Sequence, residues 1–79
     1  MREKAYVLIE IQVGKTKEVV EAIRRLKGVA SVACVTGPYD AIAMIQGETL
    51  TEIGDLLAAK VHPINGVSRT VTCLVLESS

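Results

Sequence analysis

Aromatic and histidine side chains are scarce in this sequence. Its 79 residues include two tyrosines and one histidine, with neither phenylalanine nor tryptophan. An enzyme cleft usually carries several converging polar or titratable groups. No pair of carboxylates stands out for acid–base work, and no nucleophile elbow surrounds Ser31 or Cys34. We therefore assign no catalytic residue and expect no enzymatic activity.

An excess of charge of either sign is also lacking. Nine basic residues balance nine acidic ones, and the isoelectric point is near 6.6. Proteins that bind nucleic acid usually show a basic patch or a high isoelectric point, so we expect no direct contact with DNA. No apolar run approaches the ~20 residues that span a bilayer. The N-terminal segment reads as a strand and not as a signal peptide. We expect a cytoplasmic protein with no membrane partner.

Metal and redox motifs are missing as well. Cys34 and Cys73 lie in strand-like runs without C-x-x-C spacing, so we expect two buried thiols that act as small apolar residues. His62 stands alone beside Pro63, which is typical of a surface histidine. The "GKT" at 14–16 lacks the earlier glycine that a phosphate-binding loop requires. We expect no metal and no cofactor.

Strand-like and helix-like segments follow one another in a regular order. The period-two and short apolar segments predict strands over residues 5–13, 29–36, 41–46 and 66–77. Apolar residues at helical spacing predict helices over residues 14–29 and 49–61. Thr49 with Glu52 forms a capping box at the start of the second helix. Gly28 fits the left-handed position that ends the first helix.

The element order βαββαβ predicts the fold class. With right-handed crossovers, it gives an α+β, ferredoxin-like domain: a four-stranded antiparallel sheet of order 4-1-3-2 with both helices on one face. Residues 1–79 form this single domain, because no linker interrupts the pattern. Cys34 and Cys73 then lie on opposite edges of the sheet, too far apart for a disulfide within one chain.

The sheet face opposite the helices is predicted to be apolar. Tyr6 and Leu8 point away from the aliphatic set of the first strand, and residues 41–46 are apolar on both sides. Which side of that strand meets the helices stays open. Hydrophobic residues make up 49% of the chain, and burying a few hundred Å² of such surface at about 25 cal/mol per Å² is strongly favourable. We expect at least a homodimer, paired through the sheets as in dimeric α/β barrels.

The turn in "VTGPYDAIAMIQ" (35–46) carries unusual chemistry for a tight link between strands. Gly37 allows the backbone to present N–H groups to an anion. Tyr39 offers an apolar ring with a polar tip, and Asp40 offers a carboxylate. Together these groups suit a zwitterion. The alternative is a plain hairpin turn in which Asp40 bonds the local backbone.

Two stretches carry a family resemblance. "TGPYDAIAMIQ" (36–46) resembles the G-x-Y-D turn and following strand of the Lrp/AsnC, or feast/famine, regulators, and "GVSRTVTCLVL" (66–76) resembles their G-V-x-R-T-x-T strand. The resemblance runs over nearly the whole chain. It implies the RAM domain, a βαββαβ module that pairs through its sheets, often assembles into octameric rings and binds free amino acids between subunits near the turn.

The resemblance also suggests site residues and partners. It implies a ligand site formed by Gly37, Pro38, Tyr39, Asp40, Thr70 and Thr72. Arg69, on the opposite face of its strand by alternation, is expected to pair with a carboxylate at an interface and not to contact the ligand. Full-length family members carry a helix-turn-helix, whereas four residues precede the first strand here. We therefore expect a stand-alone module that binds no DNA itself and co-assembles with full-length Lrp/AsnC regulators.

Two other functions are compatible with the same topology. One is a small enzyme of the dimeric α/β-barrel type, which the scarcity of histidine and tryptophan disfavours. The other is an ACT-like amino-acid sensor, since those domains place a glycine at the first strand–helix junction, where this chain has Gly14. The 37–40 turn favours the RAM domain over both.

Overall fold

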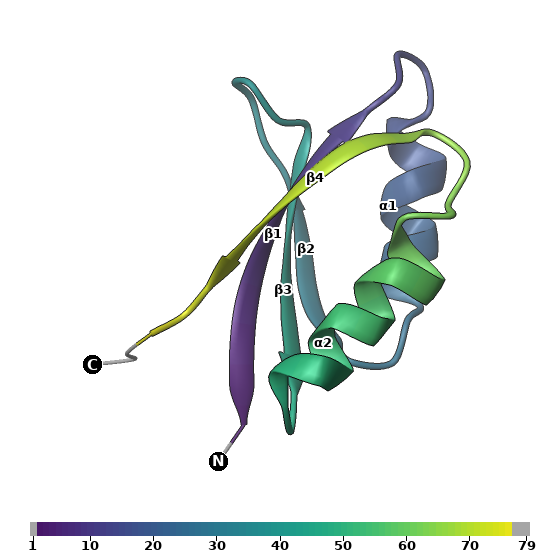
Figure 1. Ribbon diagram of the computed structural model, residues 1–79. Helices are drawn as coiled ribbons and strands as arrows, with labels where there is room; N and C mark the ends of the chain where they lie inside the picture. Colours follow the sequence, from purple (N-terminus) through teal and green to yellow (C-terminus); the bar gives the residue numbers. More distant parts are fainter. Residues whose placement is uncertain (1, 77–79) are drawn as a thin grey trace.

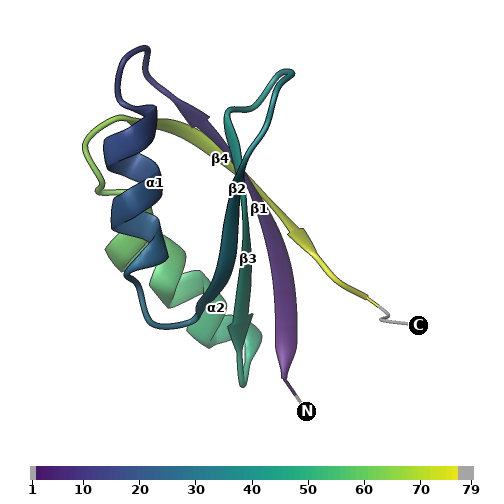
Figure 2. The same ribbon diagram turned by 180° about the vertical axis from the view of Figure 1, so that it is seen from behind.

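One antiparallel sheet, covered on one face by helices, makes up the molecule (Figures 1 and 2). The structure, a computed structural model, describes residues 2–76. The strands are β1 (Glu3–Ile11), β2 (Val29–Cys34), β3 (Ala41–Gly47) and β4 (Val67–Leu74). The helices are α1 (Thr16–Arg24), α2 (Leu50–Leu56) and a π-helical continuation, η1 (Leu57–Val61). The sheet order β2-β3-β1-β4 confirms the ferredoxin-like fold and the predicted neighbours.

The core lies between the sheet and the helices. Alternate residues of β1 and β3 point toward the helices and are almost completely buried: Ala5, Val7, Ile9, Ile11, Ala41, Ala43 and Ile45. The helices contribute Val19, Val20, Ile23, Ile53, Leu57 and Val61. The three alanines in the two central strands have short side chains, so they project little from this side of the sheet. The aliphatic core therefore closes without any aromatic side chain.

The first helix is shorter than predicted. It ends at Arg24, and the chain then turns back, with the N–H of Leu26 donating to the carbonyl of Ile23 over 3.0 Å. Gly28 does adopt a positive φ of 99°, but it closes this turn and does not follow the helix directly. Leu26 packs against the core from the turn, which is why its spacing resembled one more helical residue.

The second helix begins as predicted, because the hydroxyl of Thr49 accepts a hydrogen bond from the N–H of Glu52 over 3.1 Å. Its final turn widens into the π-helix η1, in which the N–H of His62 donates to the carbonyl of Leu57. Of the apolar residues whose helical spacing predicted this helix, Ile53, Leu57 and Val61 are buried, whereas Leu50 is 51% exposed.

Gly66 joins the helical layer to β4. It has a φ of 109°, and a Cβ placed there would lie 2.8 Å from Cγ2 of Val19 and 2.9 Å from Cβ of Lys15. Its carbonyl accepts from the N–H of Gln12 over 2.8 Å. Only glycine fits this crowded, left-handed position. The strand that follows ends at Leu74, three residues before the predicted end.

Among residues 2–76, no helix has the length and apolar character needed to cross a membrane.

Candidate functional site

The 37–40 turn lies at one end of the sheet, where it links β2 to β3 (Figure 1). Gly37 has a φ of 124°, as expected of a glycine that the turn requires. Asp40 is fixed to two strands at once. Its N–H donates to the carbonyl of Ile9 over 2.9 Å, and its carbonyl accepts from the N–H of Val35 over 3.0 Å. The turn is therefore anchored to the central strand β1 as well as to its own hairpin.

The Asp40 side chain has a structural partner. Its Oδ2 accepts a hydrogen bond from the backbone N–H of Ile11 over 2.8 Å. This bond satisfies a donor at the last residue of β1, where the pairing with β3 has already stopped. Within residues 2–76, no hydrogen bond involves the other oxygen, Oδ1. One half of the carboxylate therefore fixes the backbone of β1.

Tyr39 contacts the edge strand β4. The Nη2 of Arg69 donates to the phenolic oxygen of Tyr39 over 3.3 Å, and the guanidinium carbon lies 5.8 Å from the ring centroid. This geometry combines a hydrogen bond with a cation–π contact. The pair joins the turn to β4 across the end of β1. Sequence reasoning missed this contact, because nothing in the local pattern places residues 39 and 69 together.

The two threonines lie on the other side of β4. Thr70 pairs with Ile9 in the ladder and Thr72 with Val7, so both share the helix-facing side. The Thr70 hydroxyl is 3.0 Å from Nε2 of His62, a second contact that the sequence did not reveal.

The six predicted residues therefore do not gather at one place within a single chain. Thr70 and Thr72 share the helix-facing side of β4, and Arg69 with its contact Tyr39 lies on the opposite side.

The uncovered face of the sheet is apolar across three strands. Tyr6 lies between Met44 on β3 and Cys73 on β4. Leu8, one rung along, lies between Ile42 and Val71. The open question about β3 is thereby answered: Ile42 and Met44 face away from the helices, and Ala43 and Ile45 face the core.

The cysteines differ from the prediction. Cys34 and Cys73 are free, as expected from their places on opposite edge strands, but both are exposed in the single chain. Cys73 pairs with Tyr6 on the sheet face that the helices leave uncovered, and Cys34 lies at the end of the edge strand β2. The prediction of two buried thiols is wrong for the isolated chain.

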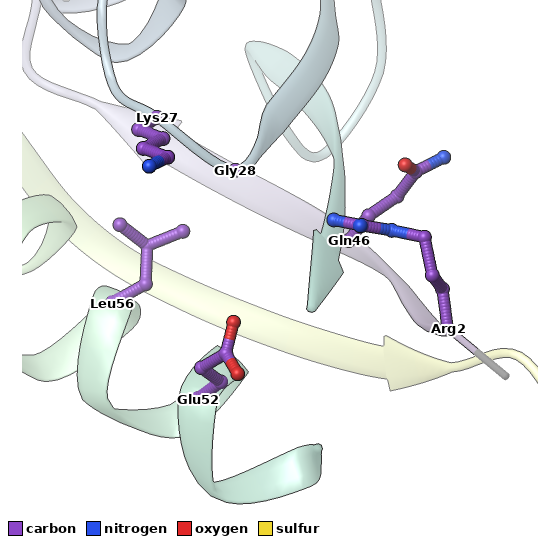
Figure 3. Close-up of a pocket in the computed structure, with 6 residues that line it drawn as sticks. All are labelled: Arg2, Lys27, Gly28, Gln46, Glu52 and Leu56. Carbon is purple, nitrogen blue, oxygen red and sulfur yellow. The ribbon is translucent and has the colours of Figure 1, made fainter. Parts of the chain in front are cut away.

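A hollow of about 350 Å³ opens at the other end of the sheet (Figure 3). Arg2, Lys27, Gly28, Gln46, Glu52 and Leu56 line it. Figure 3 shows Lys27 and Glu52 reaching toward it from opposite sides. The side chains are mostly exposed, and the hollow shares no residue with the 37–40 turn. Within the described part of the chain, no group of three or more His, Cys, Asp or Glu residues is placed to hold a metal.

Comparison with known families agrees with the fold. Residues 4–79 match the Lrp/AsnC ligand binding domain. The chain belongs to this family.

Two curated relatives are transcriptional regulators. The chain is 38% identical over 56 residues to an uncharacterized HTH-type transcriptional regulator of Pyrococcus horikoshii, covering 71% of this chain and 37% of that protein. It is 32% identical to the HTH-type transcriptional regulator FL11 of Pyrococcus furiosus, covering 92% of this chain and 48% of that protein. The chain thus spans less than half the length of these two relatives.

Solved structures reproduce the whole domain. TTHA0845 from Thermus thermophilus is 34% identical, with a TM-score of 0.93 and coverage of 98% of this chain and 96% of that one. The AsnC protein of E. coli, at 17% identity, has a TM-score of 0.91 over 96% of this chain and 52% of its own. A Neisseria meningitidis regulator solved as an L-Met complex, also 17% identical, has a TM-score of 0.86 over 95% of this chain and 50% of its own. These last two similarities concern the fold.

Proposed function

We propose that this domain is an oligomeric effector module that binds a free amino acid or similar small metabolite between subunits. The observation that carries the proposal is the pair of apolar rungs on the uncovered sheet face, which centre on Tyr6 and Leu8. Tyr6 is 49% exposed and Val71 is 36% exposed in the single chain. Contiguous apolar surface of this kind marks an interaction site. A second copy of the sheet covers it, in the manner of a dimeric α/β barrel.

The ligand site lies near the 37–40 turn and is completed by assembly. Gly37 and Pro38 shape the backbone, Tyr39 supplies an apolar wall and Asp40 supplies its free oxygen to the ligand ammonium. Thr70 and Thr72 lie on the opposite face of β4 from Arg69, so their hydroxyls come from a neighbouring subunit. Further pairing of dimers, into an octamer or another ring, brings these surfaces together.

The domain acts in transcription regulation through other proteins. The relatives named above are HTH-type regulators, and the chain matches their ligand-binding part. Ligand binding at the shared interface changes how the module co-assembles with full-length Lrp/AsnC regulators. The module itself catalyses no reaction, makes no direct contact with DNA and works in the cytoplasm.

A ligand screen tests this proposal. Each of the twenty proteinogenic amino acids is added to the purified chain, and the melting temperature is recorded together with the oligomer mass. A free amino acid has few non-hydrogen atoms, so we expect micromolar to millimolar affinity, at about 0.5–0.8 kcal/mol per atom. L-methionine is the first probe, because a structural relative was solved with it. If no amino acid at 10 mM raises the melting temperature, the proposed ligand class is refuted.

A further inference from the structure

Charged side chains bracket the apolar part of the uncovered sheet face. On β1, Lys4 stands at one end of that part and Glu10 at the other, and Arg69 lies beside Glu10 on β4. The two rungs that centre on Tyr6 and Leu8 lie between these ends. A second copy that covers the apolar rungs also withdraws the charges from water. Each charge then needs an opposite partner or a path to solvent.

Glu10 and Arg69 occupy the same rung of neighbouring strands but form no ion pair with each other. Among residues 2–76, the single pair with N and O within 4.0 Å is that of Arg2 with Glu48. The guanidinium of Arg69 contacts Tyr39 instead, with Nη2 donating to the phenolic oxygen over 3.3 Å. This bond uses one of its five N–H donors. The rung therefore presents a negative and a positive group side by side, each without an ionic partner in the described chain.

Two-fold symmetry makes such a rung complementary to itself. If the axis runs parallel to the strands, between β1 and β4, each residue of β1 lies over the β4 residue of the same rung in the partner. Glu10 then faces Arg69 of the partner subunit, and Arg69 faces the partner subunit's Glu10. Packed sheets lie about 10 Å apart, a gap that the long side chains of arginine and glutamate bridge together. The same contact occurs twice in the dimer.

An axis across the strands matches the charges less well. With the apolar rungs aligned, it turns the partner end for end, so that Glu10 meets Lys4 of the partner subunit. Arg69 then lies over Val75, which neighbours Lys4 because its N–H donates to the carbonyl of Lys4 over 2.9 Å. A guanidinium enclosed by an apolar side chain and a like charge is unfavourable. With the axis along the strands, Lys4 lies at the rim, where its flexible chain reaches solvent.

We propose that Glu10 of each chain binds Arg69 of its partner, so that two identical ion pairs set the orientation of the dimer. The inference rests on the sheet-to-sheet assembly proposed above and adds the contacts that select the partner. A guanidinium holds a carboxylate through two parallel N–H···O bonds, which gives the pair directional specificity. A regulator that co-assembles through this face needs an acidic and a basic residue at the same two places. An entirely apolar sheet would leave both charges desolvated and unpaired.

Charge reversal tests the pair, with dimer dissociation constants measured by analytical ultracentrifugation. E10R places two cations at the rung and R69E places two anions there. Because each change converts two attractions into two repulsions, we expect either variant to dimerise about 10–100-fold more weakly than wild type. The double variant E10R/R69E exchanges the charges and should return to within about 3-fold of wild type, since the two changes are coupled. K4E/E10K is measured beside it as the double variant for the end-for-end orientation.

A mixture of the two single variants separates contacts between chains from contacts within one chain. A mixed dimer restores opposite charges at both places, so the mixture should form mainly E10R–R69E dimers in native mass spectrometry. Opposite net charges also attract proteins without any specific contact. K60E and D55R provide the matched control, because they give the same net charges at exposed positions of η1 and α2. Their mixture should show no such preference.

The outcomes distinguish this inference from the proposed function. If wild type stays monomeric at micromolar concentration, the sheet-to-sheet assembly fails and this inference fails with it. If wild type dimerises and both single variants match it, or their mixture gives no more mixed dimers than the control, the Glu10–Arg69 pair is wrong. Recovery in K4E/E10K but not in E10R/R69E establishes the end-for-end orientation and overturns the pair as well. Should a single variant fail to fold, E10Q and R69Q replace the reversals, and unchanged dimerisation of both overturns it.

Discussion

The carboxylate of Asp40 accepts a hydrogen bond from the backbone N–H of Ile11, 29 positions earlier in the chain, over 2.8 Å. The contact explains part of the turn's chemistry without any ligand. An aspartate at this position fixes the end of β1 to the start of β3. The proposed ligand contact uses the second oxygen, so the structural role of Asp40 and its proposed ligand role can be separated by experiment.

Two substitutions of Asp40 separate these roles. Asn keeps an oxygen that can accept from Ile11 but loses the charge, whereas Ala loses both. Because a hydrogen bond to a charged group contributes about 1.5–3 kcal/mol, we expect Asp40→Ala to lower the free energy of unfolding by that amount and Asp40→Asn by less. Both should weaken amino-acid binding by about 1.5–3 kcal/mol. Urea unfolding and calorimetry on the same samples measure the two effects.

Asp55 provides the control for this pair. It lies exposed on α2, with no side-chain hydrogen bond in the described chain. Asp55→Ala should change neither stability nor binding appreciably. If the folded, correctly assembled Asp40→Asn protein binds the amino acid as tightly as wild type, the ammonium contact is wrong and Asp40 is a turn residue only.

Gly66 tests the packing between β4 and the helical layer. Alanine at this position meets Val19 at 2.8 Å and Lys15 at 2.9 Å in a left-handed backbone conformation. We expect Gly66→Ala to destabilise the fold by about 2–4 kcal/mol, from strain and overpacking together. Gly54→Ala is the matched change in α2, where nothing lies within 4 Å, and it should stabilise by about 0.5–1 kcal/mol. Equal unfolding midpoints for the two variants would contradict this packing.

Periodicity together with the crossover rule was enough to predict the strand order of the sheet. The alternation of β1 and the helical spacing of Val19 and Ile23 determined which residues face the core, and the right-handed crossover determined the strand order. Element ends were less predictable. Leu26 lies in a turn and still packs on the core, so the hydrophobic pattern continues past the end of α1. The π-helical turn at Leu57 leaves the pattern of buried residues intact, so no signal marks it.

The candidate site was only partly predictable. The motif selected the 37–40 turn, and alternation assigned Thr70 and Arg69 to opposite faces, as observed. The contacts Asp40–Ile11, Tyr39–Arg69 and His62–Thr70 each join elements distant in sequence, and none has a local signature. These groups meet only in the folded chain, because the pairing of three strands and the position where η1 ends place them side by side.

The uncovered sheet face should fail to pair when it carries a charge. Leu8 lies at the centre of its rung, between Ile42 and Val71. A lysine at this position would have to be buried in an apolar interface, and each copy would also lose about 1.5–3 kcal/mol of apolar burial. We expect Leu8→Lys to shift the protein to monomers in light scattering at micromolar concentration. Val13→Lys adds the same charge at a fully exposed loop position and should leave the mass unchanged.

The chain by itself should not recognise duplex DNA. Nine basic and nine acidic residues leave no net charge to neutralise phosphates. A mobility-shift titration at physiological salt should show no complex in the range tighter than about micromolar, where specific binding is found. A sequence-dependent complex in that range would show that this chain binds DNA directly and would overturn the expectation.

Native mass spectrometry, with and without the twenty amino acids, decides whether the domain assembles and binds a ligand, because it reports assembly and ligand occupancy in one spectrum. We expect dimers or larger even-numbered assemblies, with a mass increase of one amino acid per occupied site for at least one member of the panel. A stable monomer at micromolar concentration, or assemblies that take up no amino acid at any concentration up to 10 mM, would contradict this expectation.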